Sequence, residues 1–168
     1  GDQFYFIDPT RRFPCPASGS QMKLYKNLAD IFWHGAHGVL VQPEIDKKFS
    51  CECVLTAKGD KTTWTVIDFL PELREWVMCG GSCQIGGRIC WPPDDSHSEE
   101  VGWLVHTGNT PKDTIQGMLD KVDLLPPGVS AATESLIDLL KEVETGKSEG
   151  IDFTEQPLPK PVVVIENT

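Results

Sequence analysis

The sequence has no long apolar run and no amino-terminal signal. Nowhere do apolar residues continue for the ~20 positions that a helix needs to cross a bilayer, and residues 1–8 lack the basic flank and long apolar stretch of a signal peptide. An Asn-x-Ser/Thr acceptor is also missing, because Asn109 precedes Thr-Pro and Asn167 lies at the end. These absences predict a soluble chain and favour a reducing, cytoplasmic location, with an extracellular one as the alternative.

Basic residues are scarce relative to acidic ones. The 168 residues include 15 lysines and arginines against 25 aspartates and glutamates, which gives a net charge of -10. Phosphate backbones and anionic lipids repel such a chain, so nucleic acid and membrane surfaces are not expected partners. Residues 1–108 carry a net charge of -4 and residues 109–168 a net charge of -6. This concentration predicts a protein partner with a basic surface.

Motifs for nucleotides and calcium are absent as well. The Gly-Gly pairs at 80–81 and 86–87 fit neither a P-loop nor a Gly-x-Gly-x-x-Gly pattern, so they indicate turns. The acidic segment 94–100 lacks the spacing and glycine of an EF-hand, and such a run is typical of a solvated loop.

Hydrophobic patterning predicts an α+β fold, with a mixed or antiparallel sheet built from hairpins and packed against two helices. Strands are expected at residues 3–8, 37–42 and 101–106, the second of them buried, and helices at 18–35 and about 69–79. The apolar stripe of the first helix comprises Leu24, Leu28, Ile31 and Phe32.

A hairpin is predicted where the strand-like runs 49–57 and 62–67 flank a Lys-Gly-Asp-Lys sequence, which suits a type II′ turn. If these runs pair, Cys53 faces Val66. Alternate residues of the first run, among them Cys51, Cys53 and Leu55, then form one apolar face that should lie on the core.

The carboxy-terminal part has a different character. Residues 109–146 are predicted to form an α-helical hairpin that packs on the core domain, residues 1–108, or stands as a small subdomain. Its two stripes comprise Ile115, Met118, Leu119 and Val122, then Leu136, Leu139, Leu140 and Val143. Residues 147–168 are polar and proline-spaced, and we expect a flexible acidic tail.

Cysteines and histidines raise the hypothesis of a zinc-stabilised module. The candidate ligands are Cys51, Cys53, Cys79, Cys83, Cys90, His34 and His37. However, the first two cysteines are spaced i, i+2 in a strand, whereas zinc knuckles use Cys-x2-Cys turns. Buried thiols that act as small apolar side chains explain this pair without metal, so no cofactor is expected and zinc is the alternative.

Cys83 and Cys90 are the natural candidates for a disulfide. They would face each other across a hairpin whose Gly86-Gly87 turn admits positive φ at both positions. Facing residues lie about 4.5 to 5.5 Å apart at Cα, which is within the range of a disulfide. The alternative is two thiols in a strand pair.

A thiol-dependent hydrolase is the alternative function. Papain-like enzymes place their nucleophile at a helix N-terminus, and only Cys15 precedes a predicted helix in that way. His106, on a late strand, is the candidate base. The prolines on both sides of Cys15 do not match a known nucleophile motif.

Other residues favour binding over catalysis. Trp33 and Trp91 lie next to element ends, and tryptophan is enriched in binding hot spots. Val163, Val164 and Ile165 belong to a β-prone segment that could add a strand to a partner's sheet; it resembles a SUMO-interacting segment, or it begins a following domain. The titratable residues form no acid–base pair or catalytic triad at a spacing that the sequence reveals. We therefore predict a non-enzymatic protein-protein interaction or regulatory module, cut from a larger or processed protein.

Overall fold

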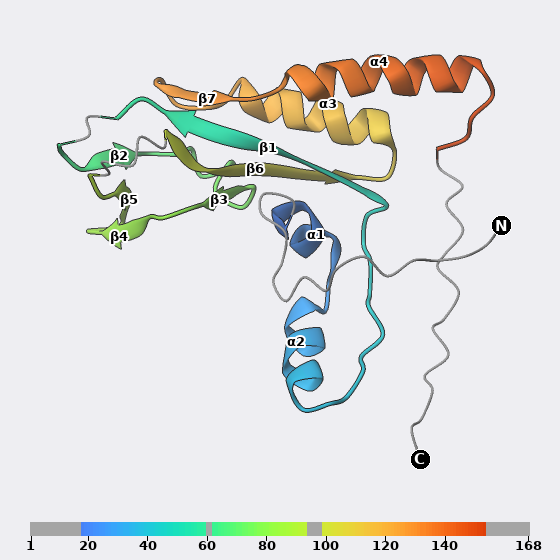
Figure 1. Ribbon diagram of the computed structural model, residues 1–168, viewed down its shortest axis with the longest axis horizontal. Coiled ribbons are helices and arrows are strands. Elements are labelled where there is room, and N and C mark those ends of the chain that lie inside the picture. Colours follow the sequence, from blue (N-terminus) through green and yellow to red (C-terminus); the bar gives the residue numbers. More distant parts are fainter. Residues whose placement is uncertain (1–17, 60–61, 94–98, 154–168) are drawn as a thin grey trace, which may run out of the picture.

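The computed structural model describes residues 18–59, 62–93 and 99–153, which form four helices and two antiparallel sheets (Figure 1). The predicted α+β class is confirmed. The helices are α1 (Ser18–Leu24), α2 (Leu28–Ala36), α3 (Pro111–Val122) and α4 (Glu134–Ser148). The strands are β1 (Phe49–Ala57), β2 (Thr65–Ile67), β3 (Val77–Cys79), β4 (Cys83–Ile85), β5 (Arg88–Trp91), β6 (Glu100–Gly108) and β7 (Val129–Ala131). The strand expected at residues 3–8 lies outside the described residues.

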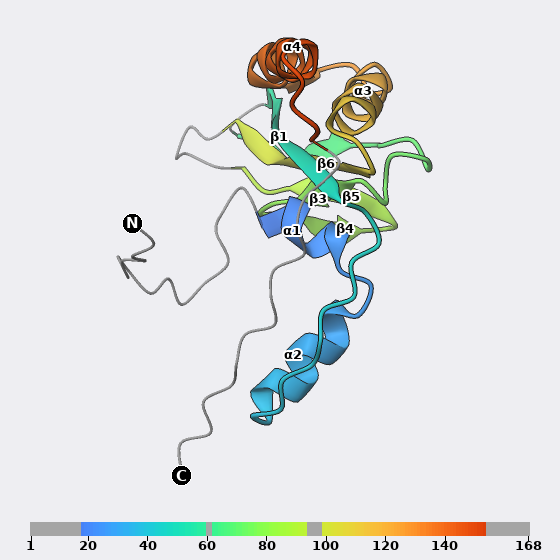
Figure 2. The same cartoon turned by 90° about the vertical axis from the view of Figure 1, so that its right-hand side faces the viewer.

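The larger sheet has the strand order β3-β6-β1-β7. Its two long strands pair from Phe49 opposite Gly108 to Leu55 opposite Gly102. Figure 2 shows α3 and α4 on one side of this sheet and α1 on the other. The smaller sheet, β2-β5-β4, lies beyond one end of the larger one (Figure 1).

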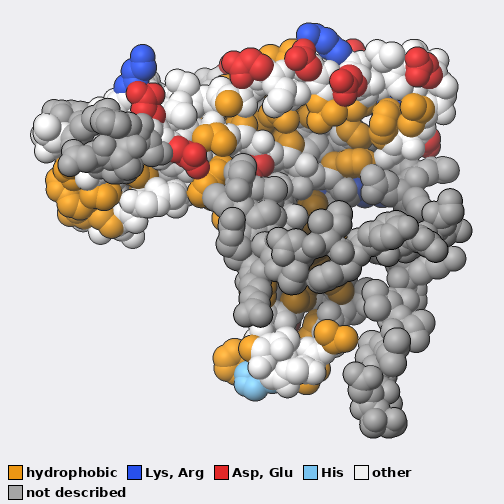
Figure 3. All heavy atoms as spheres, in the orientation of Figure 1, with side chains coloured by type: hydrophobic (Ala, Val, Ile, Leu, Met, Phe, Trp, Pro, Cys, Tyr) orange, Lys and Arg blue, Asp and Glu red, His pale blue; other side chains and the backbone are white. Residues whose placement is uncertain are grey.

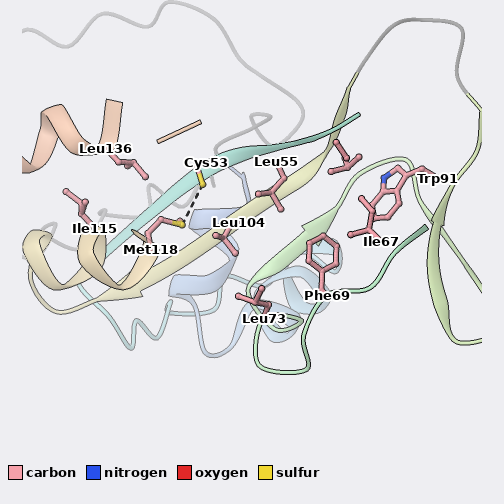
Figure 4. Close-up of a cluster of buried hydrophobic side chains, with 12 residues drawn as sticks. Cys53, Leu55, Ile67, Phe69, Leu73, Trp91, Leu104, Ile115, Met118 and Leu136 are labelled. Atoms are coloured by element: carbon pink, nitrogen blue, oxygen red, sulfur yellow. Dashed lines mark hydrogen bonds between the residues drawn. The ribbon is translucent and has the colours of Figure 1, made fainter. Parts of the chain in front are cut away.

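The core lies between β1, β6 and α3. Strand alternation directs Cys53 and Leu55 of β1 towards Leu104 of β6 and Met118 of α3, as Figure 4 shows. Leu55, Leu104 and Met118 have no exposed surface. The Cys53 thiol donates to the Met118 sulfur at 3.7 Å. The apolar face predicted for residues 49–57 is therefore confirmed.

The predicted hairpin between residues 49–57 and 62–67 is wrong. Strand β1 pairs with β6 and β7, while β2 pairs with β5, so that Val66 faces Cys90 and not Cys53. The physical reason is length: β2 has three residues, whereas β6 offers nine and satisfies the whole hydrogen-bonding edge of β1.

The single helix predicted at residues 18–35 is broken into α1 and α2. Between them, the Asn27 side chain donates to the Gln42 carbonyl at 2.9 Å and accepts from the Glu44 amide at 2.9 Å. The Lys26 amide also donates to the Glu44 carbonyl at 2.8 Å. These bonds to a later segment replace helical ones, and the chain changes direction.

Two further expectations need correction. Residues 37–42 form no strand, and Leu40 within them is 79% exposed rather than buried. The helix expected near residues 69–79 is a run of turns followed by β3, because Val77 pairs with Leu104 at the edge of the larger sheet.

The helical hairpin and the second β-hairpin match their predictions more closely. Helix α3 contributes Ile115 and Met118 to the common core. Helix α4 begins at Glu134, after the short strand β7, and it continues to Ser148, two residues into the tail expected at 147–168. The rest of that tail from residue 154 lies outside the described residues. Strands β4 and β5 flank Gly86 and Gly87, whose φ angles of 57° and 82° confirm the predicted turn.

Candidate functional site

The most distinctive surface is the arm, which we define as residues 28–45: helix α2 and the segment that returns from it. No residue of α2 is buried, and Trp33 is 68% exposed. The arm projects from the rest of the molecule (Figure 2). Apolar side chains gather at this end of the space-filling view, with histidine beside them (Figure 3). The exposed large apolar residues of the arm are Phe32, Trp33, Val39, Leu40 and Ile45.

The base of the arm is fastened by backbone hydrogen bonds. Besides the Asn27 contacts, Tyr25 forms an isolated antiparallel bridge with Ile45. An ion pair of 2.9 Å joins Lys26 to Asp46. Because both charges are solvent-exposed, that pair adds little stability. The arm therefore projects from the molecule in an orientation that the hydrogen bonds at its base fix.

The tip of the arm is ordered by Trp33 and His37. The His37 ring nitrogen Nδ1 lies 2.7 Å from the Trp33 carbonyl oxygen, and the two rings are 5.0 Å apart at their centroids. Between residues 28 and 45 the charged side chains are Asp30 and Glu44, with no lysine or arginine. The arm thus presents apolar and imidazole groups with a slight negative charge.

A second cluster surrounds Trp76, which precedes β3. The His106 ring packs on it at 4.8 Å between centroids. Two ammonium groups lie over the same indole: Lys121 from α3 at 4.6 Å and Lys23 from α1 at 5.4 Å. These cation–π contacts connect the helices on the two sides of the sheet through one ring.

His106 is held in an apolar setting. Its Nδ1 is buried and has no hydrogen-bond partner among the described residues, and Nε2 faces the backbone of Gly117. Burial lowers the pKa of His106, the Lys121 charge lowers it further, and Asp120 opposes the shift. The ring is therefore neutral at neutral pH, and a proton on it would be disfavoured.

Cys51 lies directly opposite His106 in the register of β1 and β6. Its thiol donates to the Thr114 carbonyl at 3.5 Å. Burial, with a smaller contribution from Cys53, raises the pKa of Cys51 to about 12. Because only a thiolate is a nucleophile, this cysteine and histidine do not form an activated pair.

Glu52 faces the opposite side of the sheet, towards α1. Its Oε2 accepts from the Ser20 amide at 2.8 Å, while Oε1 is buried and has no partner in the part of the chain that the structure describes. Burial raises the pKa of Glu52, and hydrogen bonds from the Ser20 and Gly19 amides act against that shift. The carboxyl group thus fixes the start of α1, which is a structural role.

The predicted ligand and catalytic residues are dispersed. Cys15, Val163, Val164 and Ile165 lie outside the described residues. His34 and His37 belong to the arm, and the thiols are divided between the two sheets. Among residues 18–59, 62–93 and 99–153, no group of three or more histidine, cysteine, aspartate or glutamate side chains is arranged to hold a metal.

The two tryptophans predicted to bind a partner differ in environment. Trp33 is exposed on the arm, as a contact residue requires. Trp91 is 7% exposed and donates its indole N–H to the Gly80 carbonyl at 2.7 Å, so it belongs to the core and offers no ring surface.

Sequence reasoning missed the other exposed residues of the arm. Phe32 belongs to the apolar stripe of the first predicted helix, and residues 37–42 to a predicted buried strand, so both patterns indicate a core and not an exposed surface. A signal was available, because α2 has apolar residues around most of its circumference and only one charged residue, Asp30. A helix with so little polar surface is either enclosed in a core or exposed for a partner.

Comparisons with known proteins give no family. No protein-family model, curated protein or solved structure matches this chain. Within the described parts of the chain, no helix combines the length and the apolar character that a bilayer crossing requires.

Proposed function

We propose that this chain is a non-enzymatic protein-binding module and that the arm is its contact surface. One observation carries the proposal: five large apolar side chains, 45% to 79% exposed, lie together on a single projecting segment. A concentration of large exposed apolar side chains on one short segment is uncommon on monomeric proteins and favours an interaction site.

The chemistry of the arm favours insertion into an apolar groove. Trp33 supplies a large ring that can be desolvated at the centre of an interface, and Leu40 adds aliphatic surface from the returning segment. A short helix that lays an apolar face into a groove is a common recognition mode. Because hydrogen bonds already hold the base of the arm, less conformational entropy is lost on binding.

Charge favours a partner that carries a basic surface in addition to that groove. The whole chain carries a net charge of -10, and the exposed surface along α4 is rich in acidic side chains (Figure 3). A negative field speeds association with a positive surface and has little effect in high salt. Lys112 and Lys141 neutralise this surface only locally, through ion pairs with Glu144 and Asp138.

The test compares two double variants of the full chain. The arm variant is Trp33→Ser with Leu40→Ser. The matched control, Ile137→Ser with Leu139→Ser, removes apolar side chains of α4 that are 41% and 44% exposed. Pull-downs from extracts, at low and high salt, are quantified by mass spectrometry. We expect a protein that the wild type and the control recover equally and the arm variant loses.

Thermal unfolding of both variants accompanies the pull-downs, so that loss of binding is separated from loss of folding. An arm variant that folds normally and recovers the same proteins as the wild type would overturn the proposal. Weaker recovery at high salt supports the basic partner, whereas unchanged recovery contradicts that part.

A further inference from the structure

The hairpin β4–β5 holds two thiols in register. Cys83 of β4 is paired directly with Cys90 of β5, and opposite residues of an antiparallel ladder project to the same side of the sheet. Their Cα atoms are separated by either ~4.5 or ~5.5 Å according to the type of pair, and both separations are within the disulfide range. The Gly86-Gly87 turn keeps this register in place.

The two thiols differ in access. Cys83 is exposed, whereas Cys90 is 5% exposed and donates to the Arg88 carbonyl at 3.6 Å. An oxidant from solution therefore meets Cys83 first. Arg88 lies two residues before Cys90 on β5, but its guanidinium is paired with the Asp68 carboxylate, so the proposal depends on access and register and not on this charge.

The other described thiols are less suited to reaction. Burial raises the pKa of Cys51 to about 12 and that of Cys53 to about 11. The pKa of Cys79 is also raised by burial, although a hydrogen bond with Ser82 opposes the shift. These three remain protonated at neutral pH, so among the described thiols exchange should favour the hairpin.

We propose that Cys83 and Cys90 form a reversible redox pair that responds to small disulfides such as oxidised glutathione. The Cys83 thiolate attacks one sulfur of the oxidant, forming a mixed disulfide and releasing one glutathione thiolate. The Cys90 thiolate then attacks the Cys83 sulfur, closes the protein disulfide and releases the second glutathione. The two protein thiols lose two electrons and two protons, and one glutathione disulfide becomes two glutathione thiols.

The bond would act on the smaller sheet. Strand β4 is the edge of that sheet and is hydrogen-bonded only to β5 within the described residues. Oxidation would add a covalent link between β4 and β5, whereas in the reduced form the two strands are joined across the sheet by their backbone hydrogen bonds. The pair is therefore a modification site, and it does not depend on the function proposed for the arm.

The experiment equilibrates the folded chain in glutathione buffers of graded potential, then blocks free thiols under denaturing conditions. Trypsin cleaves after Arg74 and Arg88, so Cys90 falls in a separate peptide from Cys83, and because Cys79 shares the peptide of Cys83, the Cys79→Ser control assigns the bond. We expect this joined pair in the wild type and in the control Cys79→Ser. Half-conversion should need at least about tenfold less oxidised glutathione than in the urea-unfolded chain.

Variants separate the two steps. Cys90→Ser, or Cys90→Ala if the serine variant unfolds, should stop at the glutathione adduct on Cys83, and Cys83→Ser should form no hairpin disulfide. A wild type that accumulates the adduct without closing the bond would overturn the proposal. So would peptides joined through another cysteine, or equal conversion in folded and unfolded protein.

Discussion

Helices α2 and α3 both carry large apolar residues at helical spacing but have opposite environments. In α3, Ile115 and Met118 are 2% and 0% exposed and belong to the core. In α2 no residue is buried, and Trp33 is 68% exposed. The comparison teaches that a helical period defines which residues share a face, whereas the connection to the neighbouring elements decides whether that face is covered.

The connections of the two helices differ in a physical way. Helix α3 follows β6 through a short turn, and its first residues are fixed by Thr110, whose hydroxyl accepts from the Asp113 amide at 3.1 Å. That turn folds the helix back over the sheet. Helix α2 follows the break at Asn27, which has no side-chain cap bond and is fastened instead to the returning segment.

Removing a core side chain should have the largest effect. Leu104→Ala deletes a fully buried group between β1 and α3, and we expect a loss of ~2–5 kcal/mol in the free energy of unfolding. Leu40→Ala on the arm should change it by less than ~0.5 kcal/mol. Urea unfolding measures both. We call the described residues outside the arm the body. Equal losses would mean that the arm packs on the body and that the contrast between an exposed α2 and a buried α3 is false.

Two helix glycines offer the next test. An added Cβ at Gly117 would collide with the His106 ring, whereas at Gly35 it would meet nothing within 4 Å. We expect Gly117→Ala to destabilise by ~1–3 kcal/mol and Gly35→Ala to stabilise by ~0.5–1 kcal/mol, because alanine favours the helix. Thermal unfolding compares them.

The collision itself can be isolated by a double variant. If the imidazole causes the loss, His106→Ala should make the added Gly117→Ala substitution much less costly. An unchanged cost would place the strain elsewhere in α3.

The sequence was sufficient where the signal is local. Alternation identified the apolar face that contains Cys53 and Leu55, helical periodicity identified α3, and the Gly86-Gly87 turn fixed the facing positions of Cys83 and Cys90. Each of these features depends on residues a few positions apart. Local patterning is therefore enough to define them.

Long-range pairing was not predictable in the same way. Phe49 and Gly108 are far apart in sequence, and the nearby turn sequence favoured a hairpin with residues 62–67 instead. The prediction for the arm was wrong for a related reason, because Asn27 breaks the first helix through contacts with Gln42 and Glu44. Helix propensity, which is local, does not include those long-range contacts. The apolar residues of the arm therefore have the sequence pattern of a core although they are exposed.

Cys53→Ser tests the packing of the body core with a side chain of nearly the same size. The thiol lies 4% exposed against Met118, and a hydroxyl there lacks an equivalent polar partner, so we expect a loss of ~1–3 kcal/mol. Cys83→Ser, at an exposed position, is the matched control and should change stability little. Urea unfolding under reducing conditions measures both. If a chelator unfolds the wild type, the cysteines bind metal and this explanation fails.

The smallest effect should be a pH dependence that originates in the body and not in the arm. Burial lowers the pKa of His106 below its ordinary 6.5, so the unfolded chain takes up that proton more readily than the folded one. Its contribution to stability is complete above about pH 6.5 and is lost as the pH falls towards the folded pKa. The raised pKa of Glu52 has the opposite effect on stability, which then decreases as the pH rises above the ordinary 4.5 of that group.

The urea midpoint of the wild type should therefore fall as the pH is lowered from about pH 8 to about pH 5.5. The same fall is expected for a His34→Gln, His37→Gln variant of the arm. His106→Gln should remove most of that fall. If the fall persists in His106→Gln and disappears in the arm variant, the pH dependence originates in the arm and this explanation is wrong.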